Sequence, residues 1–332
     1  MLEIQSYDSQ YEAMWDQFVL ESTVNGTFLQ TRRFLNYHPE GRFQDASFMV
    51  FDKKGHLVAV CPACAKIEDG GKLFDSHAGS TYGGILIEKK WYKAGKVLDI
   101  IQALENHLRN CGFDKVILRQ TPSILSVENV DLLQYCFYYL GYQCCNALSL
   151  YVDFDGYKED ILAEFSQGKR TDVHNCQKRG LYDRKLTSFS EIEQLHSLLS
   201  KSLEKYHTKP IHTAEELYSF QEDRLKGECE CFGIFDGDKM VASSMLFYFM
   251  RNSVAHTQYL CADPDYKQIS PMTYLYYTTL VEMRKRGYKK VSWGTGTENL
   301  GRYLNEGLVK SKEYYGSRHN VNLIFIKKIN KS

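Results

Sequence analysis

The chain has 332 residues, 43% of them hydrophobic, which is long for one core and suits two domains of ordinary size. Lysine and arginine together number 41, as do aspartate and glutamate, so the formal net charge is zero. A neutral chain has no global field that attracts DNA or an acidic membrane, so any anion site must be local. We expect a globular protein with no DNA partner.

The first residues lack the basic segment and following apolar run of a secretory signal, and no run of about 18 apolar residues occurs anywhere in the chain. The ten cysteines are scattered, unlike the framework of a small disulfide-rich secreted domain. These features predict a cytoplasmic protein with reduced thiols and no integral membrane segment.

Two pairs of closely spaced cysteines could have other roles. Cys61 and Cys64 form the spacing of a redox motif, but they lie in the strand-like run 56–67, and a strand places residues three apart on opposite faces. Cys229 and Cys231 lie on another expected strand, with no second pair nearby to complete a zinc tetrad. We expect neither redox chemistry nor a structural metal.

Two segments about half the chain apart resemble one another. Residues 104–118 read LENHLRNCGFDKVIL and residues 279–293 read TLVEMRKRGYKKVSW. Each combines an amphipathic helix pattern, an arginine three residues before a glycine, an aromatic residue and a Lys-Val start to a strand. Helix C-termini often look alike, so the match alone could arise by chance.

The elements around each copy also agree. Strands precede each helix, and a further helical stretch and a last strand follow it, in the same order. The pattern predicts an α/β protein, a tandem duplication of a mixed sheet covered by helices, with domains at 1–155 and 156–332.

In the second half, a strand ending near Tyr259 leads through a loop to a helix with Ser270 as its expected N-cap and Pro271 at its first position. The first backbone N–H groups of such a helix lack partners and favour an anion, with phosphate a natural occupant. Every capped helix has such an end, so position alone does not establish a site.

A basic stripe is expected on the helix that precedes Gly180. Arg170, His174 and Lys178 recur every four residues and so share one face. The stripe could hold phosphate or carboxylate groups, or it could be an ordinary solvated face.

The segment 298–317 contains three glycines among residues of mixed type. It has more turn chemistry than a packing helix needs, and its polar residues include Asn305, Lys312 and Tyr315. A binding loop and a packing element are both compatible with this pattern.

Together with the two predicted α/β domains, several motifs of the chain resemble the double-domain acyltransferases of the Gcn5-related N-acetyltransferase (GNAT) superfamily. Within it, they look like the Fem-type peptidoglycan bridge aminoacyltransferases and the acetyltransferases associated with cellulose biosynthesis. The motifs span nearly the whole chain: GTFLQTRRFL at 26–35, GSTYGG at 79–84, NCQKRG at 175–180, AHTQYLCAD at 255–263, SPMTYLYY at 270–277 and LNEGLVKSKEYYG at 304–316.

The resemblance implies transfer of an acyl group from a thioester or an aminoacyl ester to an amine. Single-domain relatives hold the pyrophosphate of coenzyme A on a glycine-rich loop, whereas this chain has QISPM at 268–272, with Ser270 and Met272 as its cofactor-binding candidates. Without glycine the backbone approaches a pyrophosphate less closely, which opposes the usual pose of coenzyme A.

By the same resemblance, the first half shapes the acceptor groove and the second holds the donor and the catalytic site. Lys312, Tyr315 and Gly316 match the lysine and Tyr-Gly pair that contact the cell-wall precursor in Fem-type enzymes. Arg170, His174 and Lys178 would then bind donor or acceptor. Asn305 joins them as a substrate-binding candidate.

For the chemistry, no nucleophilic triad is evident, so we expect direct attack by the amine in a ternary complex. His256 is a candidate base, with Gln258 on the same strand face, although a satisfied sheet histidine is the more common outcome. Tyr315 is a candidate proton donor.

The leading hypothesis is thus an N-acyltransferase that acts on an amine of a cell-wall precursor, a sugar or a peptide. Its donor is either acyl-coenzyme A, which the zero net charge slightly favours, or an aminoacyl transfer RNA. The alternative is a non-catalytic ligand-binding module with a degenerate acyltransferase fold, which the missing glycines support.

Overall fold

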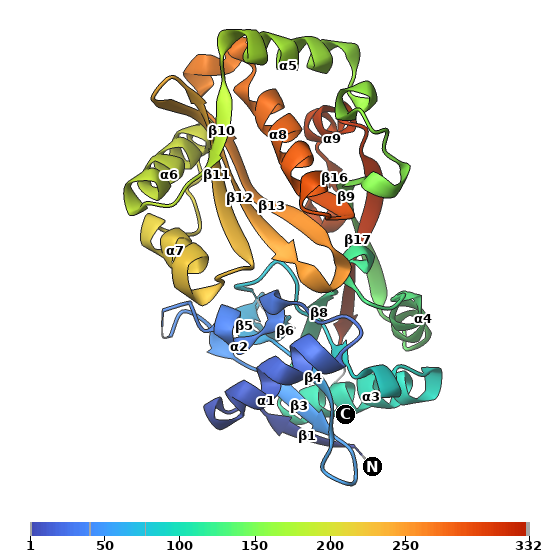
Figure 1. Cartoon of the computed structure of the whole chain (residues 1–332). Coiled ribbons are helices and arrows are strands. Elements are labelled where there is room, and N and C mark those ends of the chain that lie inside the picture. The colour runs from blue at the N-terminus through green and yellow to red at the C-terminus, as the bar shows by residue number, and fades with distance from the viewer. Residues whose placement is uncertain (1, 40, 77, 330–332) are drawn as a thin grey trace. The chain divides into compact units, whose positions relative to one another are not determined.

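The computed structural model describes residues 2–39, 41–76 and 78–329 (Figure 1). The chain divides into two compact units. Unit 1 comprises residues 1–148, 297–303 and 320–332, and unit 2 comprises residues 149–296 and 304–319. These units follow spatial contacts and do not test the predicted domain bounds of 1–155 and 156–332, which stay a prediction.

Unit 1 contains four α-helices, two larger β-sheets and one two-stranded sheet among its described residues. The helices are α1 (Glu12–Gln17), α2 (Arg32–Leu35), α3 (Ala94–Asn110) and α4 (Asp131–Tyr139). One sheet has the order β1-β3-β4-β7, from β1 (Glu3–Ser6), β3 (Phe48–Phe51), β4 (Leu57–Cys61) and β7 (Leu86–Ile87). The other has the order β9-β17-β8-β6-β5-β2, from β9 (Gln143–Asp153), β17 (Arg318–Lys328), β8 (Lys115–Arg119), β6 (Gly71–Asp75), β5 (Cys64–Glu68) and β2 (Gln44–Asp45). The short strands β15 (Thr297–Glu298) and β16 (Tyr303–Leu304) pair with each other.

Helix α3 forms where the sequence predicts it, because its apolar residues recur at helical spacing. Val97, Ile100, Ile101, Leu104 and Leu108 are all fully buried, so one face of the helix lies in the core. The helix is the crossover between β6 and β8, which pair in parallel.

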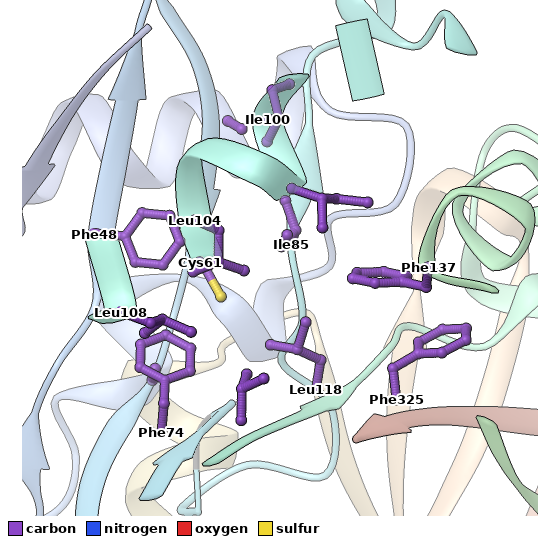
Figure 2. Packing of buried hydrophobic residues seen from close by; sticks show 14 of the residues in the cluster. Phe48, Cys61, Phe74, Ile85, Ile100, Leu104, Leu108, Leu118, Phe137 and Phe325 are labelled. Atoms are coloured by element: carbon purple, nitrogen blue, oxygen red, sulfur yellow. The ribbon is translucent and has the colours of Figure 1, made fainter. Parts of the chain in front are cut away.

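The core of unit 1 brings together residues that are far apart in the sequence. Figure 2 shows Phe48, Cys61 and Phe74 near Leu104 and Leu108 of α3, with Phe137 of α4 beside Phe325 of β17. The rings of Phe137 and Phe325 stack with centroids 4.4 Å apart. The C-terminal strand therefore completes the core of unit 1.

The cysteine pair at 61 and 64 does not lie on one strand, so the expectation of a single strand across 56–67 was wrong. The chain breaks at Pro62 and Ala63, and Cys61 ends β4 while Cys64 begins β5 in the other sheet. Both thiols are buried, and burial raises the pKa of Cys64 to about 11 and that of Cys61 further. Such thiols are poor nucleophiles, which argues against a redox site.

Unit 2 contains a sheet of order β10-β11-β12-β13-β14-β9, in which β13 and β14 are parallel and the other pairs antiparallel. Its strands are β10 (Tyr182–Lys185), β11 (Cys229–Asp236), β12 (Lys239–Phe249), β13 (Val254–Ala262), β14 (Lys290–Thr295) and part of β9. Its helices are α5 (Gln167–Arg179), α6 (Phe189–Leu203), α7 (Ala214–Ser219), α8 (Pro271–Lys285) and α9 (Glu306–Glu313).

Helix α8 is the crossover between the parallel strands β13 and β14, as α3 is between β6 and β8. It is anchored by buried residues along its length, from Pro271 to Met283, and the chain turns at Gly287, whose φ is +81°. The two copies of the predicted helix-strand pattern thus occupy the same topological position.

Among the described residues, no helix is long and apolar enough to cross a membrane. The same residues contain no group of three or more histidine, cysteine, aspartate or glutamate side chains that could hold a metal ion.

Candidate active site

The two parallel strands of unit 2 part halfway along β13. Their pairing covers Val254–His256 and Lys290–Ser292 only, whereas β13 continues to Ala262. The register of β13 against β12 shifts at Gln258, which marks a β-bulge. A strand that loses its partner next to a bulge leaves backbone groups open to a ligand, so the candidate site is centred on this point.

Strand β14 is also irregular at the point where it leaves β13. Its register against β9 shifts between Ser292 and Gly294, so Trp293 is the extra residue. Gly294 has a φ of +73°, a value that a residue with a Cβ rarely adopts. Its backbone carbonyl then faces a side chain from α9.

That side chain is Lys312, which is only 4% exposed. Its Nζ donates to the carbonyl oxygen of Thr295 at 2.9 Å and lies 3.4 Å from that of Gly294. Within the described parts of the chain it forms no salt bridge, and burial lowers its pKa from 10.5 to about 8. A cation buried against carbonyl groups without a carboxylate partner is costly, which is typical of functional sites.

His256 of β13 is buried beside Lys312. Its Nδ1 lies 3.0 Å from the Oγ of Ser292 on the neighbouring strand. Burial, and secondarily the charge of Lys312, lowers the pKa of His256 to about 4. The ring is therefore neutral at physiological pH.

Tyr315 follows Lys312 at the end of α9 and is also buried. Its ring stacks on that of Tyr276 of α8 with centroids 4.2 Å apart, and its backbone carbonyl accepts a hydrogen bond of 2.6 Å from the Tyr157 hydroxyl. Burial raises the pKa of the Tyr315 hydroxyl to about 12, so it stays protonated at neutral pH.

The structure adds three polar residues that the sequence analysis did not select. The Tyr315 hydroxyl lies 3.3 Å from the Oγ1 of Thr273, and the Nζ of Lys169 lies 3.1 Å from both Thr273 Oγ1 and Asp172 Oδ2. Lys169 and Asp172 lie on the side of α5 that packs against α8, and Thr273 is in the first turn of α8. Their spacing gave no signal, because only the packing of the two helices brings them together.

The first turn of α8 does not form a cradle for a pyrophosphate. The N–H of Ser270 donates to the carbonyl of Lys267, Pro271 has no N–H, and the N–H groups of Thr273 and Tyr274 both point to the carbonyl of Ser270. Convergent free N–H groups are what a phosphate needs at a helix N-terminus. The residues present therefore do not fit coenzyme A in its usual pose.

Ser270 itself is the N-cap of α8, as predicted, but its side chain makes no capping hydrogen bond, and its backbone is left-handed, with a φ of +53°. Met272 is half-buried in the first turn of the helix. Gln258, at the bulge of β13, is also half-buried. Ser270 and Met272 thus line the closed turn, and Gln258 lies at the point where the strands part.

The predicted basic stripe of α5 is not part of this cluster. Arg170 donates to the backbone carbonyl of Phe165 at 2.8 Å. His174 is exposed and lies 3.3 Å from the side chain of Gln177, and Lys178 is exposed. Asn305 acts as the N-cap of α9 by accepting from the N–H of Leu308. A binding role for these four residues stays a prediction.

Comparisons with known proteins agree with this architecture. Residues 167–303 match the model of a family described as an acetyltransferase (GNAT) domain. No curated protein matches the chain. The matched residues include α5, α8, β13 and β14, and end just before α9.

Solved structures match over almost the whole chain. FemX has a TM-score of 0.70 at 11% identity, with 98% of this chain and 97% of FemX covered. L-PGS from Bacillus licheniformis has a TM-score of 0.63 at 13% identity, with 99% and 94% covered. A tandem GNAT protein from the clavulanic acid biosynthesis pathway has a TM-score of 0.58 at 11% identity, with 100% of both chains covered. The predicted α/β tandem GNAT fold and its resemblance to Fem-type proteins are confirmed.

Proposed function

We propose that the protein is an N-acyltransferase that moves an acyl group from an ester or thioester to an amine of a cell-wall precursor, a sugar or a peptide. One observation carries the proposal. Lys312 is a buried cation, with a lowered pKa and no carboxylate partner in the described chain, next to the point where β13 and β14 part. Such a group can stabilise negative charge that develops on a reacting carbonyl.

The reaction that this arrangement can serve is direct aminolysis. The amine nitrogen bonds to the acyl carbon, the bond from that carbon to the donor oxygen or sulfur breaks, the amine releases a proton, and the leaving atom accepts one. Lys312 would stabilise the oxyanion, and the Tyr315 hydroxyl, which stays protonated at neutral pH, would supply the proton to the leaving atom.

His256 has a different role in this proposal from the one its position in the sequence indicated. A ring with a pKa of about 4 is a weak base at neutral pH. We therefore assign it a positioning role, in which the contact with Ser292 fixes a neutral imidazole beside the Lys312 ammonium group. Removal of the amine proton then falls to solvent or to the substrate.

The donor is the open part of the proposal. The closed first turn of α8 argues against a coenzyme A pyrophosphate held there, which makes an aminoacyl ester of transfer RNA the stronger candidate. Acyl-coenzyme A in another pose is the alternative. The reaction would take place in the cytoplasm, where both donors and amine-bearing precursors are found.

Calorimetric titration with acetyl-coenzyme A and, in parallel, with charged transfer RNA separates the donors. Binding of the RNA without binding of the thioester would support the aminoacyl donor. Micromolar binding of the thioester that is lost at high salt would place its phosphates on the protein and favour acyl-coenzyme A in another pose as the donor. A matched titration with uncharged RNA controls for nonspecific contacts.

Acceptor binding is tested at Lys312. Lys312→Ala should weaken the binding of an amine acceptor, such as a nucleotide-linked muramyl peptide, while leaving the fold intact. Lys310→Ala, on the exposed face of the same helix, is the matched control. Unchanged acceptor affinity in folded Lys312→Ala would remove this residue from the binding site.

The second candidate function is a non-catalytic binding module. The closed turn of α8 favours it, because a duplicated fold that had lost its donor site would show this arrangement. This alternative predicts binding of an amine ligand with no acyl transfer from either donor.

A further inference from the structure

Unit 1 has a groove outside the candidate active site. Its volume is about 870 Å³, in the range of ligand sites, and it lies between β1, the turn after β3 and one face of α3. Its lining residues include Leu2 and Ile4 beside β1, Trp91, and Gln102, Asn106 and Asn110 of α3.

The groove-facing side of α3 carries a row of carboxamides. Gln102, Asn106 and Asn110 lie four residues apart and are all exposed, so they follow one another at about 6 Å along the helix. A solvated helix face more often carries charged residues in pairs. A carboxamide has a donor and an acceptor side by side, which matches neighbouring hydroxyl groups. The Oδ1 of Asn106 already accepts a hydrogen bond from Arg109, so Gln102 and Asn110 are the two that offer both groups.

The charges of the groove do not favour an anion. Two lysines and two aspartates line it, so their formal charges cancel. Burial lowers the pKa of His107 below its usual 6.5, so this ring adds no charge at neutral pH. Phosphate-rich ligands gain little in such surroundings, whereas a neutral polar ligand loses nothing.

The groove also has apolar lining residues. Leu2, Ile4, Ala103 and Trp91 are among them, and all four are half-buried. One face of the indole is covered by the Lys96 ammonium group, which is 4.2 Å from the ring centroid. A lining that combines carboxamides with apolar side chains suits a ligand with hydroxyl edges and C–H faces.

From these features we propose that the groove binds a neutral oligosaccharide. A peptide that adds a strand to β1 is the competing occupant, because β1 is at the end of its sheet (Figure 1). However, Ile4 of β1 and the preceding residue Leu2 line the groove with their side chains, which also pack against the core under α3. The groove therefore presents side chains of β1 and α3 and not the free backbone edge of β1, which favours the saccharide.

Tryptophan fluorescence reports on this site without any enzyme assay. The chain has three tryptophans, and Trp15 and Trp293 are buried, which leaves Trp91 as the partly exposed one. The full chain is titrated with the tetramer of N-acetylglucosamine and with maltotetraose. We expect a saturable change with at least one of them, and no change in Trp91→Phe.

The matched variants are the double substitution Gln102→Ala with Asn110→Ala, and the control Asn175→Ala on the exposed face of α5. The double variant should bind about tenfold more weakly, because it loses hydrogen bonds at two points, while the control should bind normally. The circular dichroism spectrum and the melting temperature of the double variant establish that it is folded. Three results would overturn the proposal. They are the absence of saturable binding of either saccharide, binding by the folded double variant as tight as that of the wild type, and binding of an extended peptide in place of the saccharides.

Discussion

Replacing Lys312 with methionine isolates the cost of burying its charge. The pKa falls from 10.5 to about 8 on folding, so the unfolded chain binds this proton more tightly than the native one. At pH 7 the difference costs the native state about 3 kcal/mol, and at pH 9.5 about 1 kcal/mol. Native stability relative to the methionine variant should therefore rise with pH by about 2 kcal/mol across this interval.

Urea denaturation of both proteins at pH 7 and pH 9.5 measures this change. The carbonyl groups of Gly294 and Thr295 lose a hydrogen-bond donor in Lys312→Met at every pH. This loss therefore changes the stability difference between the two proteins by the same amount at pH 7 and at pH 9.5. The contributions of all other titrating groups to the stability difference cancel, because these groups have the same environments in the two proteins. A stability difference that does not depend on pH would refute the lowered pKa, and with it the electrostatic argument for the site.

Three further substitutions and titrations test the surroundings of Lys312. Gly316→Ala should lower the unfolding free energy by about 1–2 kcal/mol, because its φ is +69° and a Cβ there would meet Glu164 and Tyr157 at 3.0 Å. The control Gly168→Ala, at an open position of α5, should raise the unfolding free energy by up to about 1 kcal/mol. Equal effects of the two substitutions in urea denaturation would contradict this prediction. Tyr315→Phe should lower the unfolding free energy by no more than about 1 kcal/mol, because the stacked ring remains. In single-turnover kinetics, the same substitution should slow acyl transfer by about 100-fold or more. An unchanged rate would exclude Tyr315 as the proton donor. The NMR signals of His256 should show no titration between pH 5.5 and 8. Because its pKa is lowered in the native state, the unfolding free energy should fall as pH falls from about 6.5 toward 4. This loss of stability should be absent in His256→Gln.

Much of the fold follows from local patterns. The two crossover helices were predictable because buried residues recur at helical spacing and a glycine ends each pattern, as in α3 and α8. The last part of the chain was harder. For residues 298–317 the pattern left a binding loop and a packing element both open, and the structure contains the end of β15, a left-handed residue at Leu300 and β16 before α9 starts at Glu306.

The candidate site was only partly accessible from the sequence. Lys312 was selected through a family motif, and its burial against two carbonyl groups is a tertiary fact that no spacing encodes. The basic stripe on α5 was visible as a pattern, yet the residues of α5 that meet Thr273 are Lys169 and Asp172, on the side that faces α8. Periodicity identifies a face but not its neighbour, which depends on how the helices pack.

The most direct test of the account is to look for the acylated product. The full chain is incubated with each donor, acetyl-coenzyme A or charged transfer RNA, and with a panel of amines that includes a nucleotide-linked muramyl peptide, and products are identified by mass spectrometry. The account predicts an acceptor that gains one acyl group on its amine with the wild-type protein, and strongly reduced product with folded Lys312→Met. Ligand binding without product from either donor would contradict the proposed acyl transfer and leave the binding module as the function of the fold.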